Sequence, residues 1–104
     1  MTQDALQAQL DRLRAKFAAE LPRRLAEAET LLAALQAGDG EALTGLRFVV
    51  HRLNGTGGTM GFMALSQAAT ALEARLDACL RAGGAGPEDI AAIAAGLAAV
   101  RAAA

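Results

Sequence analysis

The sequence predicts an all-α protein: an antiparallel up-and-down four-helix bundle with an additional short N-terminal helix. Hydrophobic residues make up 54% of the 104 residues but aromatic residues only 3%, and the excess is alanine interleaved with leucine, which favours helix. Valine, isoleucine and threonine never form an alternating run, so no strands are predicted. Apolar residues recur at helical spacing in blocks separated by glycine, and this length suits one domain, residues 1–104.

Five blocks with this spacing account for the chain. Pro22 either opens the second helix or kinks one long helix that joins the first two blocks. Gly38 ends the second block and Asp39 can cap the third, while Pro87 starts the last. In chain order the apolar seams are Leu6, Leu10, Leu13 and Phe17; Leu21, Leu25, Leu32 and Leu35; Leu43, Leu46, Val50, Leu53, Gly57 and Met60; Leu65, Ala69, Leu72, Leu76 and Cys79; Ile90, Ile93, Leu97 and Val100.

Each seam covers only one side of its helix, so the apolar surface is buried only if the helices pack side by side. Short connections make consecutive helices antiparallel, and the first block is expected to lie as a short helix across one end. Cys79, the only cysteine, is expected to be a packing residue of the core. The bundle closes within one chain, which predicts a monomer.

Composition excludes several classes of protein. The net charge is -1 and no block of lysine or arginine stands out, so nucleic acid is not an expected partner. The longest uncharged apolar stretch, residues 90–100, is much shorter than the ~20 residues of a membrane-spanning helix. The N-terminus also lacks the pattern of a signal peptide, so we expect a cytoplasmic protein, and Met1 favours a free-standing one.

The single histidine, His51, follows the core position Val50 and is expected to face solvent, roughly 130° from the centre of the seam. Arg47, Phe48, Gly55 and Gly58 lie on the same face, although a glycine inside a helix costs about 1 kcal/mol relative to alanine. One explanation is that the helix ends here in a glycine-rich loop. The other is steric clearance for a partner's backbone beside the imidazole, with Phe48 as a docking contact.

The surroundings of the histidine favour a nucleophilic role. The glycine spacing does not fit a nucleotide-binding loop, the lone histidine is a poor metal site, and no serine or cysteine nucleophile lies in range. A nucleophilic imidazole needs a free ring nitrogen, and a carboxylate on the other nitrogen would fix its tautomer. If the helices before and after position 61 form an antiparallel hairpin, two residues face each other when their numbers sum to about 124. This register places Glu73 opposite His51 and Asp77 opposite Arg47.

The stretch from His51 to Glu73, HRLNGTGGTMGFMALSQAATALE, resembles the signature of histidine-containing phosphotransfer (HPt) domains of two-component phosphorelays. That signature is roughly H-x-L-K-G-[ST], a glycine ten residues after the histidine, and then L-x-x-x-[AC]-x-x-L-[EQ]. By this resemblance His51 is the phosphoacceptor and Glu73 orients its imidazole. The matching positions also make Gly55 the clearance glycine and Gly61 the turn glycine.

One position departs from the family signature. The family usually has lysine three residues after the histidine, where its charge helps to neutralise the phosphoryl group, and here the residue is Asn54. Asparagine could donate a neutral hydrogen bond to a phosphate oxygen. Arg47 and Arg52 are candidate sources of the missing positive charge.

The resemblance implies a stoichiometric carrier rather than an enzyme. His51 would take a phosphoryl group from the aspartate of one receiver domain and pass it to another, with a hybrid histidine kinase and response regulators as partners. No cofactor is expected on this chain, because the receiver supplies the Mg²⁺. The sequence fits the dimerisation domain of a histidine kinase less well, because such a domain typically has an acidic residue directly after the histidine, where this chain has Arg52. The alternative is a helical adaptor that binds receivers or kinases without chemistry.

Overall fold

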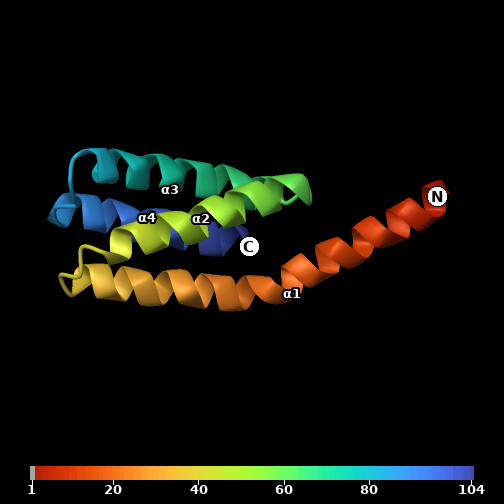
Figure 1. Ribbon diagram of the computed structural model, residues 1–104, viewed down its shortest axis with the longest axis horizontal. Helices are drawn as coiled ribbons and strands as arrows, with labels where there is room; N and C mark the ends of the chain where they lie inside the picture. Colours follow the sequence, from red (N-terminus) through yellow and green to blue (C-terminus); the bar gives the residue numbers. More distant parts are fainter. Residues whose placement is uncertain (1) are drawn as a thin grey trace.

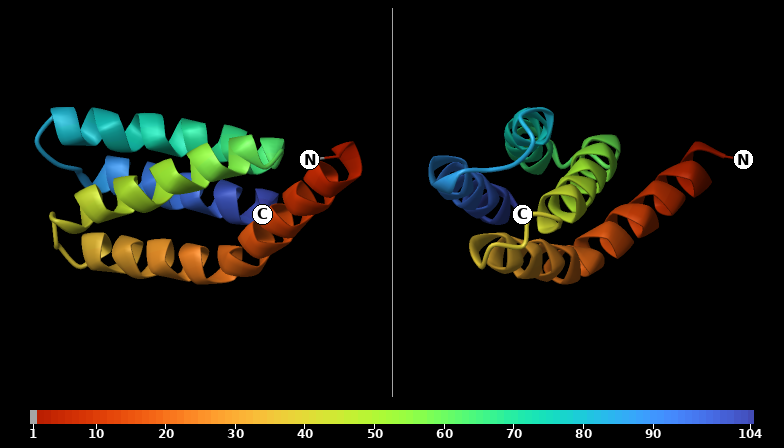
Figure 2. Two further views of the ribbon diagram at one scale, coloured as in Figure 1. Left: turned by 45° about the vertical axis from the view of Figure 1, so that its right-hand side comes forward. Right: turned by 60° about the vertical axis from the view of Figure 1, so that its left-hand side comes forward.

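The computed structural model describes residues 2–104, so Met1 lies outside the described part. It consists of four helices, α1 (Gln3–Gln36), α2 (Ala42–Thr59), α3 (Met63–Arg81) and α4 (Pro87–Ala103), and no strand occurs within these residues. Figure 1 shows the C-terminal half of α1 beside α2 and α4, with α3 on the far side of these two helices, and Figure 2 shows the same bundle from two further directions. The predicted all-α bundle is confirmed.

The N-terminal region differs from the expectation of a separate short helix. Pro22 lies inside α1, which runs without a break from Gln3 to Gln36, so the first two predicted blocks form one helix and four helices replace five. The N-terminal half of α1 bends away from the bundle and projects past the α2–α3 turn (Figure 1). Proline lacks the N–H that would bond to the preceding turn, and its ring crowds that turn's carbonyl, which accounts for a bend near this position.

The projecting half of α1 leaves part of the first predicted seam in solvent. Leu6 is 49% exposed and Leu13 is 44% exposed, while Phe17 is buried. The Arg14 guanidinium donates from Nε to the Met60 carbonyl at 2.9 Å, which joins α1 to the α2–α3 turn. The expected burial of Leu6 and Leu13 is wrong because the other helices do not extend beyond this turn.

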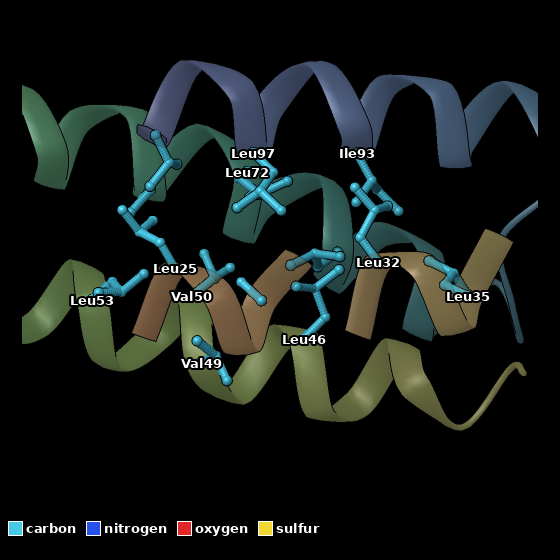
Figure 3. Packing of buried hydrophobic residues seen from close by; sticks show 14 of the residues in the cluster. Leu25, Leu32, Leu35, Leu46, Val49, Val50, Leu53, Leu72, Ile93 and Leu97 are labelled. Carbon is cyan, nitrogen blue, oxygen red and sulfur yellow. The ribbon is translucent and has the colours of Figure 1, made fainter. Parts of the chain in front are cut away.

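The core itself follows the predicted seams of α2, α3 and α4 closely. Leu46, Val50, Leu53 and Leu76 are each 0% exposed, and Cys79 is buried as expected. Figure 3 shows leucines of α1 and α2 meeting Leu72, Ile93 and Leu97 in this core. Because the bundle buries this face of α2, the opposite face of α2 is exposed to solvent.

The turn between α2 and α3 is short, and Gly61 has a φ of +86°, a conformation that glycine adopts without strain. The Phe62 N–H donates to the Gly57 carbonyl at 2.8 Å and closes the end of α2. This tight connection sets the register between the two helices that carry the candidate site.

Candidate functional site

His51 lies on α2 with its side chain 55% exposed, one residue after the fully buried Val50. The helix continues through Gly55, Gly57 and Gly58 to Thr59, so the glycine-rich segment is helical and not a loop. The backbone that carries His51 is therefore held on both sides by regular helix, with the imidazole at the surface as predicted.

Glu73 of α3 lies opposite His51, as the register of the hairpin predicted. His51 Nδ1 is 3.0 Å from Glu73 Oε1, and the glutamate side chain is only 16% exposed. A carboxylate only accepts hydrogen bonds, so Nδ1 must carry the proton and donate it. In the neutral ring this leaves the lone pair on Nε2, the nitrogen directed away from Glu73.

Arg47 connects Glu73 to a second carboxylate. Its Nε donates to Asp77 Oδ1 at 3.0 Å, and its Nη2 lies 3.8 Å from Glu73 Oε2. A row of alternating charges therefore runs along the α2–α3 contact from Asp77 through Arg47 to Glu73, whose other oxygen contacts the His51 imidazole. The Arg47 side chain is turned toward α3, where it contacts Glu73, the residue that in turn contacts the His51 imidazole.

Asn54, one turn after His51, is also held by α3. Its Oδ1 accepts a hydrogen bond from Ser66 Oγ at 2.8 Å and lies 3.1 Å from Thr70 Oγ1. The carbonyl side of the amide is thus turned to α3, and the Nδ2 side remains a hydrogen-bond donor. Ser66 and Thr70 were not identified from the sequence, although the same register rule places Thr70 level with Asn54.

The glycines near His51 have different surroundings. A Cβ on Gly55 would meet nothing within 4 Å, whereas a Cβ on Gly58 would lie 3.2 Å from Ser66 Oγ. The absent side chain of Gly58 therefore makes room for α3, which differs from the expected clearance for a partner. Gly55 opens onto a hollow of about 420 Å³ that is also lined by His51, Arg52 and Thr56.

Phe48 and Arg52 lie on the other exposed side of α2, toward α1. Phe48 is 58% exposed, and the Arg52 guanidinium carbon lies 5.6 Å from the centre of its ring. Such a contact orders an arginine over an aromatic face without burying either group. Both side chains are at the surface, one turn or less from His51, as the sequence indicated.

These features define a class of protein: a helical bundle that presents one carboxylate-supported histidine on an open surface. The sequence profile of the Hpt domain matches residues 12–103, and the chain belongs to the Hpt domain family. No match was found among curated proteins or among solved structures.

Membership of this family gives the chain a phosphotransfer role in two-component signalling, with receiver or kinase proteins as its partners. Hpt domains are phosphocarriers rather than enzymes. No helix within residues 2–104 has the length and apolar character needed to cross a membrane.

Proposed function

We propose that this protein relays a phosphoryl group between the aspartates of two receiver domains through phosphohistidine at His51. The observation that carries the proposal is the exposed imidazole whose Nδ1 is held by Glu73 at 3.0 Å. This contact selects the tautomer with a free Nε2, and the exposure of the ring leaves Nε2 accessible to a phosphoaspartate on another protein.

In the first step the Nε2 lone pair attacks the phosphorus of the aspartyl phosphate. The P–N bond forms as the P–O bond to the aspartate breaks, and the aspartate leaves as a carboxylate. The ring becomes cationic because Nδ1 keeps its proton, and the negative Glu73 stabilises that charge. In the second step a carboxylate of another receiver attacks phosphorus, and the bonding pair returns to Nε2.

The neighbouring side chains have separate parts in this proposal. Asn54 donates from Nδ2 to a phosphoryl oxygen, because Ser66 and Thr70 fix the orientation of its amide. Arg47 is a positioning residue that acts through Glu73. Gly55 provides clearance, and Phe48 and Arg52 contact the partner. The protein acts as a monomeric, cytoplasmic, stoichiometric carrier, and the Mg²⁺ belongs to the receiver.

The test is incubation of the protein with a receiver domain carrying radiolabelled phosphoaspartate, with His51→Gln as the matched variant. Acid-labile label on the wild type and none on His51→Gln is expected. Equal label on both proteins would overturn the assignment of His51. A panel of receivers that bind the protein without transferring label would favour the silent adaptor, which the departure from lysine at Asn54 makes the second candidate.

A further inference from the structure

The surface between α1 and α2 next to His51 is hollowed into a groove of about 440 Å³. Arg52, Thr56 and Met60 line both this groove and the smaller hollow at His51, so the two are continuous. We use the name basic groove for the surface formed by its four cationic residues, which are Lys16, Arg23, Arg24 and Arg52.

The positive charge of the basic groove is incompletely neutralised. Within residues 2–104, no carboxylate lies within 4.0 Å of the charged nitrogens of Lys16, Arg23 or Arg52. Arg24 pairs with Glu20 at 2.8 Å through Nη2, yet its Nη1 is buried without an acceptor. The chain as a whole has a net charge of -1, so this groove is a local exception.

The opposite side of His51 has the reverse character. There Glu73 and Asp77 of α3 both pair with Arg47. His51 therefore stands at the border between a cationic α1–α2 side and an anionic α2–α3 side. A surface with this polarity attracts a complementary partner in one orientation and repels it in the reversed one.

We propose that the basic groove binds an acidic surface of the phosphorylated receiver and so fixes the orientation in which its phosphoaspartate meets Nε2. This rests on the proposed relay function and adds to it the chemistry of the partner. The groove also exposes apolar surface, at Leu13 and at the neighbouring Phe48, which are 44% and 58% exposed. The partner surface is therefore expected to combine acidic side chains with apolar ones, as protein interfaces commonly do.

The test compares Arg23→Glu with Arg81→Glu. Arg23 is exposed, lines the groove and makes no ion pair with residues 2–104, so its reversal should not harm the fold. Arg81 is also exposed and lies in the last turn of α3, outside the groove, and its replacement by glutamate makes the same change in net charge. KM and kcat for label uptake are measured with the receiver that phosphorylates the wild type fastest, at low and high salt.

Arg23→Glu is expected to raise KM about tenfold at low salt while kcat stays within about twofold, and the difference should shrink at high salt. Arg81→Glu should match the wild type within about twofold. Phosphoramidate, a small phosphodonor that needs no docking surface, should label His51 equally in all three proteins.

An unchanged KM in Arg23→Glu, or equal changes in both variants, would overturn the proposal while leaving the relay function intact. A different result would be that inorganic phosphate inhibits the wild type more than chloride of equal ionic strength does, and fails to do so in Arg23→Glu. That result would show that the groove binds a free anion instead of a receiver. A dimer of the wild type that Arg23→Glu abolishes would assign it to a second copy. Failure of the wild type to take label from any receiver would overturn the relay function itself.

Discussion

Replacing Gly55 with alanine is expected to stabilise the fold and to slow phosphoryl transfer. Gly55 lies inside α2, and a Cβ built on it meets nothing within 4 Å, so alanine fits without strain. Alanine in a helix interior is more stable than glycine by about 1 kcal/mol, which raises the Tm of a domain of this size by about 4 to 8 °C. The methyl group would protrude into the hollow beside His51, where a receiver's backbone must approach.

Thermal unfolding gives the stability change, and single-turnover label uptake from a phosphorylated receiver gives the rate. We expect kcat/KM to fall about tenfold or more, because in-line transfer tolerates little displacement of the reacting atoms. Thr44→Ala is the matched control, since it improves helix propensity on the same helix at an exposed position near its start. A more stable Gly55→Ala protein that transfers at the wild-type rate would refute steric clearance, and a less stable one would refute the helix argument.

Three further changes test other parts of the structure. Glu73→Gln should lower the transfer rate about tenfold, with little change in the urea midpoint, because a neutral amide stabilises the cationic ring poorly; an unchanged rate would contradict the role of this contact. Leu46→Ala should lower the free energy of unfolding by about 2 to 5 kcal/mol in urea denaturation, because Leu46 is 0% exposed and its removal leaves a cavity in the core. A loss below about 1 kcal/mol would contradict the tight packing around Leu46. Burial raises the pKa of the Cys79 thiol above its ordinary value of 9.0, so a thiol reagent should react only after unfolding. Since the unfolded thiol ionises first, the contribution of Cys79 to the free energy of unfolding should be constant below pH 9.0 and decrease as pH rises above it, and rapid labelling of the folded protein would contradict the burial.

The sequence was most informative where one short turn fixes the geometry. The hairpin around Gly61 leaves little freedom of register, so its position was sufficient to predict the contact of His51 with Glu73 and that of Arg47 with Asp77. The register of the hairpin predicts which residues face each other, but it does not predict what these residues do.

The sequence was least informative about the path of α1 and the side chains that hold Asn54. Proline is compatible with the first turn of a helix and with a bend inside one, so the pattern around Pro22 could not distinguish the two. The seam at Leu6 and Leu13 indicates an amphipathic helix but carries no information on whether another helix extends far enough to cover it. Ser66 and Thr70 have the composition of ordinary helix surface, and their hydrogen bonds to Asn54 become evident only in three dimensions.

The unbroken α1 makes this small protein a rod, with extents of 52 × 21 × 21 Å. A rod experiences more friction in solution than a sphere of equal mass, so gel filtration calibrated with globular standards will overstate its mass of 10.6 kDa. Elution somewhat earlier than that of a globular protein of equal mass is therefore expected even from a monomer, and light scattering or sedimentation equilibrium, which do not depend on shape, gives the true mass. The four helices also lie roughly along the long axis (Figure 1), so their amide N–H bonds should share one slow rotational diffusion time in NMR relaxation, with departures where α1 bends.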